Sequence, residues 1–153
     1  HQNERSAVEF TWNEFALVYF DDGKFFLRTF GKTNRTEEEI KENEVNINRL
    51  LGINDFTMVN ECFPEPYITC CFVGDDKIFI DIFYNYKLTH YHFFWDIRSK
   101  RIVGKRGKQR MASNKANFPY SCFYSETRNE VYSFYRQGEC FLVKQDKPHK
   151  FGF

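Results

Sequence analysis

Residues 77–86 read Lys-Ile-Phe-Ile-Asp-Ile-Phe-Tyr-Asn-Tyr, and this stretch decides the fold expected for the chain. Successive side chains of a strand point to opposite faces of the sheet. The three isoleucines therefore share one face, while Phe79 and Phe83 share the other. A half-exposed sheet would carry polar residues on one side. Because both faces are apolar here, we expect this strand to be sandwiched between two layers.

The composition of the whole chain also favours strands. Of its 153 residues, 20% are aromatic, and most of these are phenylalanine. The 22 basic and 21 acidic residues nearly balance, which argues against a wholly disordered chain and against one that coats nucleic acid. No apolar run approaches the ~18–20 residues that a membrane-spanning helix needs, so we expect no membrane span.

Three strand-rich units share a layout, and we place them near residues 6–31, 66–104 and 119–145. The second and third units each begin with Pro-Tyr, continue with Cys-Phe and a polar turn, and end in further apolar strands. Each unit is expected to hold three strands and a more polar connection. A repeat of this size is typical of solenoids, propellers and arrays.

A helical insertion near residues 36–52 separates the first unit from the second. Thr36 and Glu39 have the spacing of a capping box, in which the two side chains cap the start of a helix. Apolar residues follow, and Gly52 can end the helix. We therefore predict one helix over roughly Glu37–Leu51.

Several stretches resemble blades of β-propeller proteins. Those similar to hemopexin-type or Kelch-like repeats are Ala7–Phe10, Val18–Phe20, Gly23–Phe26, Tyr91–Asp96 with Arg98–Arg101, and Glu130–Phe134. The double glycine of Kelch repeats is absent. The resemblance implies a binding or scaffold role, and it carries over no catalytic residue.

We therefore predict an all-β fold with one inserted α-helix, built from propeller-like repeated antiparallel sheets. The residues 1–153 would form a single β-rich domain. A single antiparallel β-barrel or sandwich is the alternative. Three units are fewer than the ~4–8 blades of a closed propeller. The chain would then belong to a larger propeller or assembly, or would self-associate.

The sequence offers little for catalysis. His90 and His92 would share one face of a strand, but a metal site needs at least a third ligand, and no spacing selects Asp81 or Asp96 for it. We expect two strand-surface histidines. No nucleophile motif or phosphate loop is present. We therefore predict that the protein is no enzyme and needs no metal or cofactor.

The five cysteines leave the cellular compartment open. An odd number fits no closed set of disulfides, which slightly favours an intracellular protein with buried, reduced thiols. The glycosylation triplet Asn34-Arg35-Thr36 is compatible with secretion instead.

The segment 98–115 is strongly basic and contains no acidic residue. We predict a loop here, and a partner-binding site formed by Lys100, Arg101, Lys105, Arg106, Lys108 and Arg110. The favoured function is a non-enzymatic scaffold or protein-interaction module. One alternative is a β-barrel that binds a small apolar ligand. A second is nucleic-acid binding, because phosphate backbones attract such clusters. A merely solvated loop would show the same composition.

Overall fold

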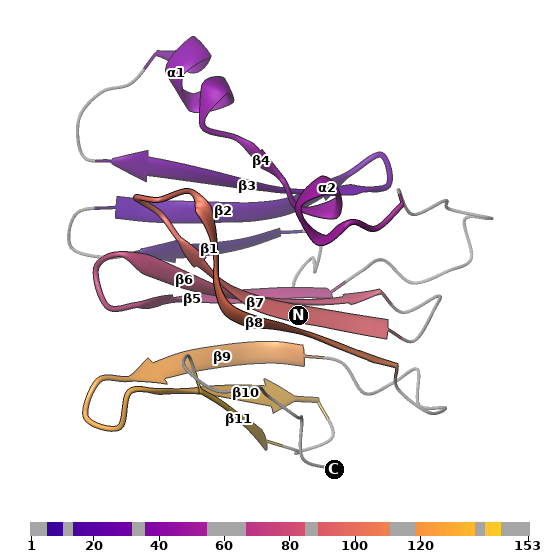
Figure 1. Ribbon diagram of the computed structural model, residues 1–153, viewed down its shortest axis with the longest axis vertical. Helices are drawn as coiled ribbons and strands as arrows, with labels where there is room; N and C mark the ends of the chain where they lie inside the picture. The colour runs from indigo at the N-terminus through magenta and orange to yellow at the C-terminus, as the bar shows by residue number, and fades with distance from the viewer. Residues whose placement is uncertain are drawn as a thin grey trace.

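The computed structural model describes residues 6–10, 14–31, 36–54, 67–84, 89–110, 119–136 and 140–144. Within these ranges the protein is mostly β, as the composition predicts, and its strands form three antiparallel sheets (Figure 1). Cys62 and the sequon residues Asn34 and Arg35 lie outside the described residues.

Each sheet is a meander in which strands adjacent in sequence pair with one another. The first sheet has the order β1 (Ser6–Phe10), β2 (Glu14–Asp21), β3 (Lys24–Gly31) and β4 (Val45–Asn46). The middle sheet has the order β5 (Tyr67–Val73), β6 (Lys77–Tyr84), β7 (Thr89–Asp96) and β8 (Arg101–Arg110). The third sheet has β9 (Pro119–Ser125), β10 (Glu130–Tyr135) and β11 (Cys140–Lys144).

None of the three sheets closes into a barrel within the described strands, so the alternative of a single barrel is not observed. Two of the sheets have one strand more than the three expected in each unit. β4, from the insertion, is the fourth strand of the first sheet, and β8 is the fourth strand of the middle sheet. Without β4 and β8, the strands β3 and β7 would be edge strands with unpaired backbone N–H and C=O groups. Pairing with these groups makes the polar segments of β4 and β8 adopt strand structure.

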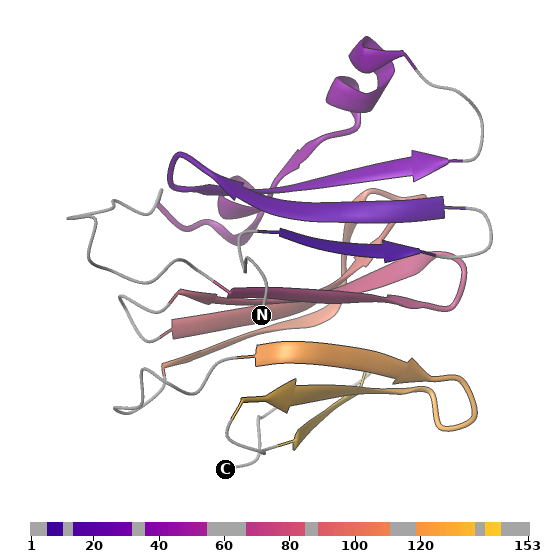
Figure 2. The same cartoon turned by 180° about the vertical axis from the view of Figure 1, so that it is seen from behind.

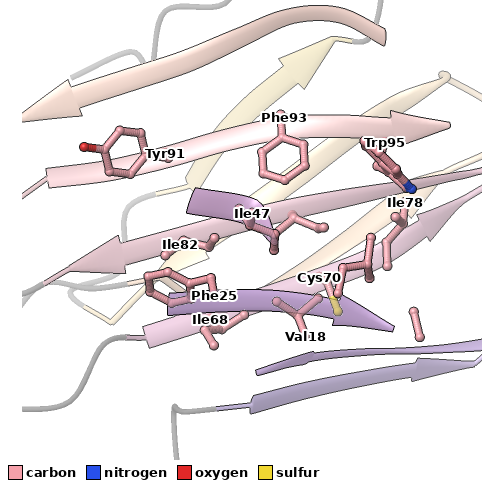
Figure 3. Close-up of a cluster of buried hydrophobic side chains, with 13 residues drawn as sticks. Val18, Phe25, Ile47, Ile68, Cys70, Ile78, Ile82, Tyr91, Phe93 and Trp95 are labelled. Carbon is pink, nitrogen blue, oxygen red and sulfur yellow. The ribbon is translucent and has the colours of Figure 1, made fainter. Parts of the chain in front are cut away.

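The middle sheet is covered on both faces, as the apolar pattern of residues 77–86 predicts. Its isoleucine face packs against the first sheet and the second helix of the insertion, and Figure 3 shows these side chains pointing toward one another. Its other face, which carries Phe79 and Phe83, packs against Val131 and Tyr135 of the third sheet. Burying each side chain of this size stabilises the fold by roughly 1.5–3 kcal/mol.

The first strands of the three sheets lie side by side. β5 lies beside β1 on one side and β9 on the other. Both views show that these three strands run in the same direction (Figures 1 and 2). The sheets therefore meet along their first strands, and their later strands lie farther from this line.

The insertion holds two short helices instead of the single helix predicted. α1 (Glu37–Glu42) begins as expected, because the Thr36 hydroxyl accepts a hydrogen bond from the Glu39 N–H at 3.2 Å. The chain then extends as β4 and pairs with β3 before α2 (Ile47–Leu51) begins. The Asn46 side chain explains why a second helix begins here: its carboxamide oxygen caps α2 by accepting a hydrogen bond from the Arg49 N–H at 3.1 Å.

The buried side chain of Asn48 ties α2 to the β2–β3 hairpin. Its Oδ1 accepts from the Phe25 N–H at 2.8 Å, and its Nδ2 donates to the Gly23 carbonyl at 3.1 Å. The hairpin turn has a φ of 46° at Asp22 and of 78° at Gly23, as tight two-residue turns between antiparallel strands require. Among the described residues, no helix has both the length and the apolar character to cross a membrane.

Candidate interaction surfaces

The basic residues selected from the sequence lie at one edge of the middle sheet. Lys100 ends the turn between β7 and β8, and the remaining five lie on β8: Arg101, Lys105, Arg106, Lys108 and Arg110. Among the described strands β8 pairs only with β7, so it is an edge strand. The predicted loop is therefore wrong over residues 101–110. Residues 105–110 are described by their backbone alone, and residues 111–115 lie outside the described ranges.

Asp96 builds the turn that precedes β8. Its Oδ1 accepts from the N–H groups of Arg98 and Ser99, each at 2.9 Å, and its carbonyl accepts from the Lys100 N–H at 2.9 Å. The Ser99 N–H is the main cause that lowers the pKa of the Asp96 carboxyl. Lys100 adopts a φ of 56°, which L-residues other than glycine seldom adopt. The turn therefore holds Lys100 in a defined position.

Lys100 contacts the helical insertion. Its Nζ donates a hydrogen bond to Oδ1 of Asn43 at 2.8 Å, although 57 residues separate the two in sequence. Arg101, the next residue, is exposed. The structure thus brings one predicted binding residue against the chain's own insertion and leaves its neighbour open to solvent.

A buried polar network joins the middle and third sheets. Ser133 on β10 donates to Oδ2 of Asp81 on β6 at 3.1 Å, and both side chains are fully buried. Oδ1 of the same carboxylate lies 3.4 Å from Nδ1 of His90 on β7. That nitrogen is also hydrogen-bonded to the Tyr135 hydroxyl at 3.2 Å. Because all four groups are sealed between two sheets, the network is suited to joining them.

His90 and His92 share one face, as the sequence predicts, and their ring centroids lie 5.9 Å apart. The expectation that they lie on the surface was wrong, since both are buried between the sheets. The burial of the two histidines is not evident from the sequence, because the strand that covers them, β10, follows about 40 residues later in the chain. Within the described ranges, no cluster of three or more His, Cys, Asp or Glu residues could hold a metal ion.

A charged cluster closes part of the first sheet's outer face. Glu44, from the insertion, accepts hydrogen bonds from the Arg28 guanidinium and, at 2.6 Å, from the Tyr19 hydroxyl. The guanidinium lies over the Tyr19 ring, which stacks on Phe26 at 5.2 Å between centroids. Burial and the bond to Glu44 raise the pKa of Tyr19 to about 12. Burial alone would raise the pKa of Glu44, but the bonds from Tyr19 and Arg28 together lower it.

Two cysteines meet where β5 and β9 lie side by side. Cys71 is buried in the core between the middle and third sheets, and Cys122 packs against the same core. The hydrogen bond with Cys71, together with burial, raises the pKa of the Cys122 thiol well above its usual value. Among the described residues no disulfide joins Cys70, Cys71, Cys122 or Cys140, and Cys140 is exposed, whereas the sequence favoured buried thiols.

The outer face of the third sheet carries an apolar patch that the sequence reasoning missed. We call it the outer patch, and it comprises Phe123, Tyr132, Phe134 and Leu142. Phe123 and Leu142 are 48% and 42% exposed, and they are the exposed large apolar residues of the described chain. The alternation of side chains along β9 and β10 indicated in the sequence which residues share this face. Strand pairing was needed to show that these residues are neighbours.

Comparisons of this chain with models of protein families, with curated proteins and with solved structures found no match. The geometry of the described residues therefore supplies the functional argument.

Proposed function

We propose that the chain is a non-enzymatic scaffold of β-propeller-like blades that binds an acidic protein segment along its basic edge strand, β8. Propeller blades are typically four-stranded antiparallel sheets arranged around a central channel. The first and middle sheets have four strands each, and all three sheets are meanders. The side-by-side, same-direction arrangement of β1, β5 and β9 supports the proposal, because blades of a propeller also meet along corresponding strands.

The observation that carries the binding proposal is the basic character of an edge strand. An edge strand offers unpaired N–H and C=O groups, to which an extended segment can add as a further strand. Five of the six basic residues lie on this strand, and the whole segment 98–115 lacks acidic residues. Backbone pairing would supply affinity, and the positive charge would select acidic sequences over neutral or basic ones.

The direct test is the binding of a labelled glutamate-rich peptide, measured by fluorescence anisotropy at about 50 mM and about 200 mM salt. We expect affinity that falls at the higher salt. Replacing Lys105, Arg106 and Lys108 with alanine should weaken binding at least about tenfold, because each ion pair with a glutamate of the peptide would contribute up to about 1 kcal/mol.

The matched control replaces three exposed basic residues away from β8, namely Arg49, Arg128 and Arg136, with alanine. It removes the same net charge and should bind as the parent protein does. If both variants lost the same affinity for the peptide, the overall charge of the protein would explain the binding, and the proposal would be contradicted. Tighter binding to a single-stranded RNA than to the peptide would instead favour the nucleic-acid alternative.

A further inference from the structure

The outer patch runs across all three strands of the third sheet. Phe123 on β9 is directly opposite Tyr132 on β10, and Tyr132 is directly opposite Leu142 on β11. The Phe123 ring also stacks on Tyr132 and Phe134, with centroids 5.2 and 5.6 Å apart and the rings within 19° of parallel. These side chains therefore form one continuous, ordered apolar surface.

The two open ends of the three-sheet stack differ in chemistry. At the first sheet, Arg28 and Glu44 place charge over the stacked rings of Tyr19 and Phe26. At the third sheet, the two most apolar members of the outer patch, Phe123 and Leu142, stay nearly half exposed. Exposed apolar surface of this kind, spread over neighbouring strands, marks an interaction site.

We propose that the outer patch is the contact surface of a homodimer, in which the third sheets of two copies pack face to face. This inference is independent of the proposed binding along β8. It extends a packing mode that the chain already uses, since the inner faces of its sheets meet through aromatic and aliphatic rows. A two-fold dimer needs a self-complementary surface.

The charges around the outer patch meet that condition. The nearby described charges are Glu126, Arg128, Glu130 and Arg136, and Lys144 of β11 is paired opposite Glu130, so charges of both signs border the patch. A two-fold axis can therefore set acidic groups of one copy against basic groups of the other. Growth of longer stacks is disfavoured, because the charged cluster of Arg28 and Glu44 covers part of the opposite end. A second copy offers one matching outer patch. Once the two outer patches pack together, no further copy can add through them, and the assembly stops at a dimer.

Four apolar side chains are fewer than the ~20–30 residues a side of a standard interface, so we expect a concentration-dependent dimer. Sedimentation equilibrium of the chain up to about 200 µM should show a monomer–dimer equilibrium. Phe123→Glu should raise the dimer dissociation constant at least about tenfold, because it buries an unpaired charge at the centre of the interface.

Leu142→Lys, on the edge strand β11, is the second variant and should also raise the dissociation constant. The control is Asn54→Glu, an exposed residue after α2, which adds the same negative charge away from the third sheet and should leave the dissociation constant unchanged. Circular dichroism melting curves identify any variant that has not folded. A chain that stays monomeric throughout the concentration range would overturn the proposal, and so would a dimer that neither Phe123→Glu nor Leu142→Lys weakens.

Discussion

Ser133 and Asp81, 52 residues apart in sequence, are joined by a 3.1 Å hydrogen bond in which the Ser133 hydroxyl donates to a fully buried carboxylate. The two residues belong to β10 and β6, so this bond crosses from the third sheet to the middle sheet. It stands beside the contact of the same carboxylate with His90. The interface between these sheets is thus held by a polar link set within an apolar core.

Ser133→Ala should therefore destabilise the fold by about 1–3 kcal/mol, because it leaves a buried carboxylate oxygen without its donor. Chemical denaturation, followed by tryptophan fluorescence, measures the change. Ser121→Ala is the matched control, since Ser121 is exposed on β9, and its effect should stay within about 0.5 kcal/mol. Equal effects of the two changes would argue against this role for the network.

Glu44 should make stability depend on pH. Its pKa is lowered in the folded protein, because the bonds from Tyr19 and Arg28 outweigh the opposing effect of burial. The carboxylate therefore stabilises the fold above its ordinary pKa, and this contribution is lost as the pH falls through the lowered folded-state value. Glu44→Gln should lower the free energy of unfolding by about 1 kcal/mol at neutral pH. The effect is modest because the side chains of Arg28 and Glu44 are 35% and 17% exposed, so solvent screens their interaction.

The measurement is urea denaturation across the acid range for the parent and for Glu44→Gln. The stability difference between them should shrink toward zero as the pH falls. Glu126→Gln serves as a control in the exposed turn between β9 and β10. A difference that stays constant with pH would show that the charge of Glu44 is not the stabilising feature.

The thiols should react in a defined order. Cys140 is exposed, whereas Cys122 is packed against Cys71 and has a strongly raised pKa. Because the thiolate is the reactive form, Cys122 should be alkylated more slowly than Cys140 near pH 8, by at least about tenfold. Timed reaction with iodoacetamide, followed by peptide mass mapping, gives the order. Faster labelling of Cys122 than of Cys140 would contradict the buried contact.

Gly52 should contribute to stability through its backbone conformation and not through a lack of space for a side chain. Its φ is 69°, and nothing lies within 4 Å of an added Cβ. Gly52→Ala should cost about 1 kcal/mol from the left-handed backbone, and Gly52→Asn should cost less, because asparagine tolerates this region better. Thermal or chemical denaturation of the two variants tests the difference. A larger cost for asparagine would point to crowding instead.

The sequence predicted the strand character and the capping of the first helix by Thr36, because these depend on neighbouring residues. It also predicted that residues 77–86 are covered on both faces, because the apolar pattern is local. It failed where distant pairing decides the outcome. β7 recruits β8 as a strand, and β3 recruits β4 and so divides the expected helix. The location of the buried His90 and His92 likewise depended on the third sheet.

The amino-acid sequence by itself determined which segments can be strands and which faces of those strands must avoid water. Periodicity and turn chemistry act over a few residues, and they can be read directly. Only the tertiary structure decided which sheet covers which face, and therefore that Ser133 meets Asp81 and that the side of the third sheet carrying Phe123 is left open. The physical reason is that these contacts join residues far apart in the chain, through packing between sheets that no local pattern specifies.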